Sequence, residues 1–136
     1  MASKTLFVCR GNVGRSQMAA ELFAKNTKTE PYSAGTNVFE KENEKLKDIP
    51  LAEPVIRFMK AEGIDVSENE RTQITPELAT QFEKIIVMAE PEHIPEYLLN
   101  NTKVEIREVL DPKGMDDAGY IEVIKEIKNR LEILMQ

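Results

Sequence analysis

An apolar run that passes through a glycine-containing turn into a helical pattern constrains this chain more than any other feature. Residues 5–9, Thr-Leu-Phe-Val-Cys, are β-branched or apolar, which suits a strand buried on both faces. From about Ser16 to Asn26-Thr27, apolar residues recur at helical spacing. A buried strand that leads directly into a helix predicts the first half of a βαβ unit.

The same alternation continues to the end of the chain. Extended segments are predicted at 31–34, 84–88 and 104–109, the last one more exposed, and helical segments at 54–63 and from 75–77. A long terminal helix is predicted from an apolar stripe of Tyr120, Ile121, Ile124, Ile127, Leu131 and Leu134. Strands separated by helices predict an α/β fold with a mostly parallel sheet and right-handed crossovers.

The charged stretch from Glu40 to Asp48 is expected to be a solvated surface loop, although such loops also line binding sites. In parallel sheets ligands bind beyond the carboxyl ends of the strands. Cys9 lies at that end of the first predicted strand, so the turn after it is the place to look for a site.

The turn from Cys9 to Arg15 has the composition of an anion-binding loop. Three of its residues tolerate left-handed backbone angles: Gly11, Asn12 and Gly14. Such a loop directs successive N–H groups inward, and the following helix adds its positive dipole end. Arg15 adds a planar fork for two phosphate oxygens. The same field stabilises a thiolate, and Ser16 is placed to donate a hydrogen bond to it, so the pattern favours a nucleophile aimed at phosphorus.

Two other interpretations compete with this one. In the first, Cys9 is a buried, inert residue, the commonest fate of a lone cysteine. A nucleotide P-loop is disfavoured because the segment 11–16, Gly-Asn-Val-Gly-Arg-Ser, lacks the required spacing and lysine. A thiolate that attacks phosphorus also needs a proton donor for the departing oxygen. Asp111, followed by Pro112 after the last predicted strand, is the candidate, and a plain turn is the alternative for this pair.

Composition excludes several classes of protein. A formal net charge of −6 argues against broad nucleic-acid binding, which needs a basic face. No stretch approaches the length of a membrane span, and the N-terminal apolar run is too short for a signal peptide, so we expect a cytoplasmic protein without a membrane partner. One cysteine and one histidine form neither an internal disulfide nor a zinc site of the Cys/His type. No metal and no cofactor are predicted.

With these motifs in place, the chain resembles the low-molecular-weight protein tyrosine phosphatase family over essentially its whole length. The matching segments are 8–16, Ser33-Ala34-Gly35-Thr36, 63–67, 82–88 and Asp111-Pro112. The resemblance implies one domain over residues 1–136, with three layers: a four-stranded parallel sheet flanked by helices, and a phosphate-binding loop after the first strand. The expected ligand of that loop is phosphate or arsenate.

The resemblance also implies roles for single residues. Cys9 would be the nucleophile, Arg15 the ligand of the phosphate and the transition state, Ser16 the hydrogen-bond donor to the thiolate, and Asp111 the general acid and later the base. The phosphate-binding residues would be Arg10, Gly11, Asn12, Val13, Gly14 and Arg15. Asn12 would hold the loop through hydrogen bonds to Ser16 and Ser33.

Four positions depart from the family pattern or extend it. Gly14 stands where many members have a second cysteine that protects the nucleophile by a disulfide. Asn69 stands where a histidine is frequent, and a hydrogen bond to Asn12 is expected from it. Lys113 replaces an aromatic wall residue, and Phe39 is the candidate for the other wall.

The expected substrate is a phosphorylated protein or a small phosphomonoester, with phosphotyrosine, phosphoarginine and small phosphoesters all open. Two alternatives remain. The segment 14–19, Gly-Arg-Ser-Gln-Met-Ala, also resembles the related arsenate reductases, and a reductase with one cysteine would need an external thiol. The other alternative is a binder of phosphate or phosphoproteins without catalysis.

Overall fold

A four-stranded parallel sheet organises the protein in a computed structural model that describes residues 4–134. The strands are β1 (Thr5–Cys9), β2 (Ser33–Gly35), β3 (Lys84–Val87) and β4 (Val104–Ile106). Their order across the sheet is β2-β1-β3-β4, and every neighbouring pair is parallel. The predicted α/β class with a four-stranded parallel sheet is confirmed.

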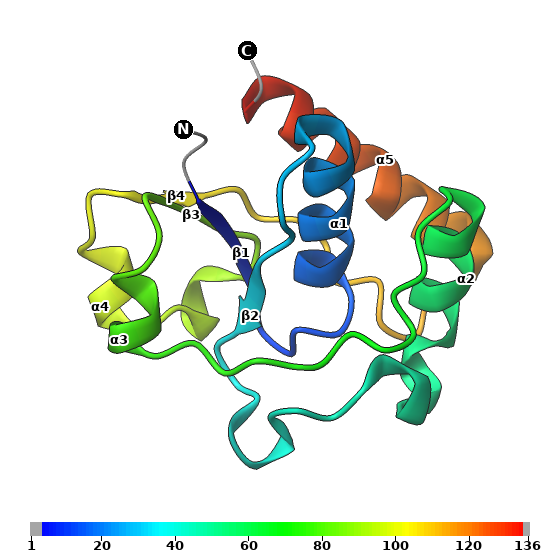
Figure 1. Ribbon diagram of the computed structural model, residues 1–136, viewed down its shortest axis with the longest axis horizontal. Helices are drawn as coiled ribbons and strands as arrows, with labels where there is room; N and C mark the ends of the chain where they lie inside the picture. Colours follow the sequence, from blue (N-terminus) through cyan, green and yellow to red (C-terminus); the bar gives the residue numbers. More distant parts are fainter. Residues whose placement is uncertain (1–3, 135–136) are drawn as a thin grey trace.

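Helices cover both faces of this sheet, which makes three layers (Figure 1). The helices are α1 (Arg15–Thr27), α2 (Glu53–Ala61), α3 (Pro76–Ala79), α4 (Glu96–Leu99) and α5 (Asp117–Leu134). Phe7 of β1 belongs to the apolar core shared with α1, α2 and α5, whereas its neighbours Leu6 and Val8 belong to the core shared with α3 and α4. Successive strand residues point to opposite faces, so one five-residue strand anchors both cores.

The predicted boundaries agree with these elements to within a few residues. α1 begins at Arg15 rather than Ser16, and β4 is shorter than the predicted segment 104–109. The predicted stripe of the terminal helix is wrong at Ile121, whose side chain is 53% exposed; Val123 is buried in its place. The buried positions then follow the i, i+3, i+4, i+7 spacing of one helix face, and Ile121 falls outside it.

The long connection between β2 and α2 is only partly the solvated loop that its charges predict. It contains three short 3₁₀ turns, Phe39–Lys41, Leu46–Asp48 and Pro50–Ala52. Leu46 is fully buried in the core beside α2, which fixes the middle of the connection. The charged side chains around it are therefore held near the carboxyl edge of the sheet, where β1, β3 and β4 also end.

None of the helices within residues 4–134 is long and apolar enough to cross a membrane.

Candidate active site

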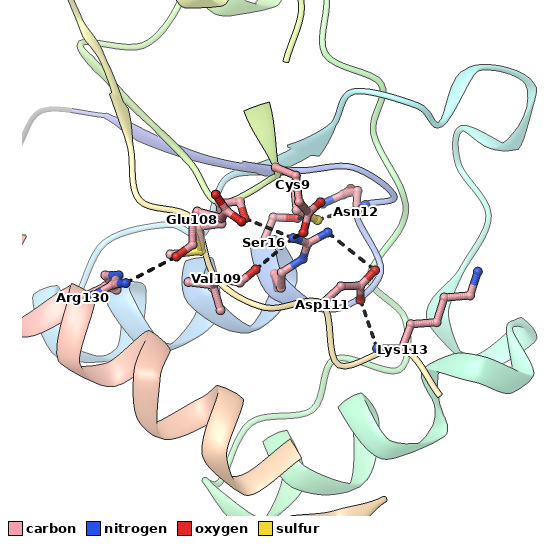
Figure 2. A network of polar contacts seen from close by, with 11 residues as sticks. Cys9, Asn12, Ser16, Glu108, Val109, Asp111, Lys113 and Arg130 are labelled. Atoms are coloured by element: carbon pink, nitrogen blue, oxygen red, sulfur yellow. Dashed lines mark hydrogen bonds and ion pairs between the residues drawn. The ribbon is translucent and has the colours of Figure 1, made fainter. Parts of the chain in front are cut away.

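The loop between β1 and α1 surrounds the sulfur of Cys9, which is 3% exposed at the end of its strand. The backbone N–H of Asn12 donates a hydrogen bond to Sγ over 3.3 Å. The hydroxyl oxygen of Ser16, in the first turn of α1, lies 3.0 Å from the same sulfur. Two polar groups thus converge on the sulfur (Figure 2).

Asn12 holds this loop together from behind. Its backbone has φ +55°, a left-handed conformation in which Asn is one of the few tolerated side chains. Its Nδ2 donates to the hydroxyl oxygens of Ser16 over 2.8 Å and of Ser33 over 2.9 Å, so both bonds that the resemblance implied are present. Its Oδ1 accepts from the backbone N–H of Thr72 over 2.8 Å, which ties the loop to the chain ahead of α3.

Arg15 is the first residue of α1 and is almost completely buried. Its Nη1 donates to the carbonyl oxygens of Met88 (3.1 Å) and Val109 (3.0 Å), and to the carboxylate of Glu90 (2.9 Å). These acceptors follow β3 and β4, so the ends of two strands fix the guanidinium. Its Nη2 lies 3.7 Å from Oδ2 of Asp111.

Asp111 approaches the site from the segment that connects β4 to α5. Its Oδ1 accepts a hydrogen bond from the backbone N–H of Lys113 over 3.0 Å, and Pro112 between them is buried. The carboxylate is about half exposed, so it is accessible to a substrate and to water. The Lys113 side chain extends away from Asp111 toward the outside (Figure 2).

A cavity of about 510 Å³ lies over the loop. Five of the predicted phosphate-binding residues line it: Arg10, Gly11, Val13, Gly14 and Arg15. Cys9 and Asp111 line the same cavity, which brings the predicted nucleophile, phosphate ligand and acid into one space. Asn12 and Ser16 are fully buried and support the loop from beneath.

Tyr120 of α5 forms part of the cavity wall, together with the apolar side chains of Ile49, Leu51 and Val55. Burial, helped by the nearby carboxylate of Asp111, raises the pKa of Tyr120 above its ordinary value. Its phenol therefore stays protonated and uncharged over the whole neutral range.

The prediction that Phe39 forms an aromatic wall is wrong. Phe39 is 58% exposed, has φ +47° and does not line the cavity. The backbone N–H groups of Val38 and Phe39 both donate to the side-chain carbonyl of Gln73, over 2.6 and 2.8 Å. This tight turn buries Val38 and directs Phe39 to the solvent, and Asn37 and Lys41 line the cavity there instead.

The expected hydrogen bond between Asn69 and Asn12 is also absent among the described residues. Asn69 Nδ2 donates to Oε1 of Gln17 (3.1 Å) and to Glu21 (2.7 Å). Gln17 in turn donates to the backbone carbonyl of Asn12 over 3.2 Å. Asn69 therefore reaches the loop only through Gln17, whose Nε2 also lies 3.4 Å from the Asn12 Oδ1 that accepts from Thr72.

Sequence reasoning missed three residues at this site: Gln17, Arg71 and Glu90. Glu90 pairs with Arg15, and Gln17 is buried beneath the loop. Arg71 is 8% exposed, and its Nε donates to the carbonyl of Gly11 over 2.9 Å. Charged and amide side chains are usually solvated, so no pattern in one sequence distinguishes these three.

Comparison with known proteins agrees with this geometry. Residues 4–136 match the family described as low molecular weight phosphotyrosine protein phosphatase. A low molecular weight protein tyrosine phosphatase from T. tengcongensis is similar, with a TM-score of 0.80, 24% identity and 98% of each chain covered. The YwlE arginine phosphatase from Geobacillus stearothermophilus has a TM-score of 0.74 and 24% identity, over 98% of this chain and 94% of that chain. An arsenate reductase in the phosphate binding state has a TM-score of 0.73 and 27% identity, over 98% of this chain and 96% of that one.

Proposed function

This chain belongs to the low molecular weight phosphotyrosine protein phosphatase family and is a phosphatase of that type, and we propose that it hydrolyses phosphomonoesters through a phosphocysteine intermediate. The expected substrate is protein phosphotyrosine. The observation that carries this proposal is the placement of Cys9, Arg15 and Asp111 on one cavity, with the sulfur already hydrogen-bonded by Asn12 and Ser16.

In the first step, the Cys9 thiolate attacks phosphorus and forms the S–P bond while the ester P–O bond breaks. Asp111 gives its proton to the departing oxygen, which leaves as an alcohol or phenol. The loop N–H groups and the guanidinium of Arg15 bind the equatorial phosphoryl oxygens, where charge develops in the transition state. Val13 and Gly14 line the same cavity, and their backbone N–H groups would be among these donors.

In the second step, water attacks the phosphocysteine. Asp111, now ionised, takes a proton from that water as the P–O bond forms, and the S–P bond breaks to regenerate the Cys9 thiolate and release inorganic phosphate. Half-exposure of the Asp111 carboxylate supports this role, because the same group needs contact with water after the leaving group departs.

Arsenate reduction is the second candidate, and the arsenate reductase in its phosphate binding state supports it, since arsenate copies phosphate in shape and charge. Cys9 is the single cysteine of the chain. An internal relay of thiols is therefore impossible, and reduction would need an external thiol to supply the two electrons. Because of this requirement, we propose phosphate hydrolysis ahead of arsenate reduction. Binding of a phosphoprotein without turnover is the third candidate function.

We further propose a cytoplasmic phosphatase that acts on a phosphorylated protein or small phosphoester and has no nucleic-acid or membrane partner. A reducing compartment would keep the unprotected Cys9 thiol active, since Gly14 offers no second sulfur to it. The net charge of −6 supports the absence of a nucleic-acid partner.

The test compares the wild type with Cys9→Ser on p-nitrophenyl phosphate at mildly acidic pH without added metal. We expect turnover in the wild type and none in the variant, and a phosphorylated Cys9 after acid quench in mass spectrometry. A folded wild type that releases no p-nitrophenol, or equal activity in both proteins, contradicts the proposal. Arsenate reduction with added small thiols is measured on the same preparations, and activity there alone would favour the second candidate.

A further inference from the structure

A second guanidinium stands beside the phosphate-binding loop and is not used by the mechanism above. Arg71 lies in the segment between α2 and α3 and is more than nine-tenths buried. Its Nε donates to the carbonyl oxygen of Gly11 over 2.9 Å, and its Nη1 donates to the carboxylate of Glu44 over 2.8 Å. Backbone hydrogen bonds to Asn43 and Glu44 hold the same residue. Arg71 is therefore fixed in orientation rather than free in solvent.

The remaining amino group of Arg71 is free to bind a ligand at the cavity. Nη2 makes no hydrogen bond to any residue between 4 and 134, and Arg71 lines the cavity. Nη2 would lie 3.6 Å from a Cβ placed on Gly11, two residues along the loop from Cys9. A ligand group bound beside Gly11 would therefore be within reach of Arg71 while the phosphoryl group of the same ligand is bound by Cys9 and Arg15.

The charges around the cavity agree with a second anion there. Its lining has five basic side chains, Arg10, Arg15, Lys41, Arg71 and Lys113, against three acidic ones, Glu44, Asp48 and Asp111. The chain as a whole has a net charge of −6. A local excess of positive charge on an acidic protein attracts and orients anionic ligands, and Arg10, Lys41 and Lys113 add to it from the exposed rim.

We propose that the cavity selects phosphomonoesters that carry a second anionic group, and that Arg71 binds this group beside Gly11. The inference rests on the proposed function for the position of the phosphoryl group. Glu44 limits the strength of the contact, because it already shares the Arg71 guanidinium. The second anion has two possible sources: an acidic side chain next to the phosphorylated residue of a protein, or a second phosphate or carboxylate on a small molecule.

The experiment measures binding rather than turnover, by calorimetry with benzylphosphonate and 3-carboxybenzylphosphonate. The two ligands share the phosphonate and differ in the second anion. We expect the carboxylated ligand to bind the wild type about tenfold more tightly, a typical effect of one charge-assisted hydrogen bond. In Arg71→Gln we expect the two ligands to bind with about equal affinity. In Glu44→Gln we expect the preference for the carboxylated ligand to rise, because removal of the competing carboxylate frees the guanidinium.

Arg57→Gln is the matched control, since Arg57 is an ion-paired arginine outside the cavity lining. This variant should prefer the carboxylated ligand as strongly as the wild type does. A preference in Arg71→Gln that equals that of the wild type overturns the proposal. An equal fall in the affinity for both ligands in that variant overturns it as well. Glu44→Gln guards against misfolding of the arginine variant, because a gain in preference cannot come from a damaged fold. Failure of Glu44→Gln to raise the preference also overturns the proposal.

Two further ligand pairs distinguish the sources of the anion. Phosphonate peptides with an acidic or a neutral neighbour test the protein source, and a small bisphosphonate against a monophosphonate tests the other. Loss of p-nitrophenyl phosphate turnover with the binding preference intact would contradict the proposed phosphatase function alone. Turnover without the preference would contradict only the role of Arg71.

Discussion

The hydroxyl oxygen of Ser16 lies 3.0 Å from the sulfur of Cys9 and accepts a hydrogen bond from Asn12 Nδ2 over 2.8 Å. A serine hydroxyl has one hydrogen to donate. The Asn12 amide occupies one of the two acceptor sites of this oxygen, and the hydroxyl hydrogen is free to be donated to a Cys9 thiolate. One side chain therefore connects the Asn12 support of the loop to the sulfur of Cys9.

Ser16→Ala should slow both catalysis and the reaction of Cys9 with iodoacetamide. Loss of a hydrogen bond to a charged atom costs about 1.5–3 kcal/mol, which corresponds to a roughly 10- to 100-fold lower kcat on p-nitrophenyl phosphate. Ser67→Ala is the control, because the Ser67 hydroxyl bonds Asp65 outside the cavity. Unchanged alkylation and unchanged kcat in Ser16→Ala would remove Ser16 from this role.

Asp111→Asn should affect substrates according to the quality of their leaving group. A general acid contributes about 10²- to 10⁴-fold when the departing oxygen needs a proton, and much less when it leaves readily. We therefore expect a loss in kcat/KM of about 100-fold or more for an alkyl phosphate and about tenfold or less for p-nitrophenyl phosphate. Asp48→Asn, which alters another carboxylate of the same cavity, should leave this ratio unchanged. Equal losses for both substrates would exclude Asp111 as the acid.

Gly35→Ala should destabilise the protein and displace the phosphate-binding loop. A Cβ on Gly35 would lie 2.7 Å from the carbonyl oxygen of Arg10 and 2.9 Å from the backbone nitrogen of Asn12. Overpacking of this kind costs about 1–3 kcal/mol, measured as the free energy of unfolding in urea, and phosphatase activity should fall with it. At Gly14 the added Cβ finds ordinary contacts of 3.8 Å or more, so Gly14→Ala is the folding control. Equal stability of both variants would contradict the close approach.

Asp117→Asn should lower stability at neutral pH and have no effect in acid. The Arg57 guanidinium donates two hydrogen bonds to this carboxylate and holds the pKa of Asp117 below its ordinary value. A carboxyl with a lowered pKa contributes stability above its unfolded value of about 3.9, and the contribution is lost as the pH falls through the lower folded value. Urea midpoints at pH 7 and pH 2 measure the difference between wild type and variant.

Glu122→Gln is the control for this pH dependence, since Glu122 is an exposed carboxylate on the same helix. We expect its urea midpoint to follow that of the wild type at both pH values. A destabilisation by Asp117→Asn that persists unchanged at pH 2 would show that the ion pair is not its cause.

Local sequence patterns are enough to predict the framework around the loop. The run 5–9 can form a strand buried on both faces, and the segment from Cys9 to Ser16 has the glycines, the asparagine and the arginine that an anion-binding loop needs. The strand and the turn into a helix could be predicted because each depends on neighbours in the chain: the period of apolar residues, the tolerance of left-handed angles, and the start of a helix after a turn.

The distant side chains that complete the site are brought there by tertiary packing. Arg71 bonds Gly11, 60 residues away along the chain, and Glu90 bonds Arg15, 75 residues away. Phe39 is closer in sequence, but its side chain faces the solvent, and its backbone N–H donates to Gln73. Asn69 bonds Gln17, and Gln17 together with Thr72 donates to the Asn12 side-chain oxygen. Such contacts depend on how loops at the carboxyl edge of the sheet pack against one another, and no local period or motif encodes that packing.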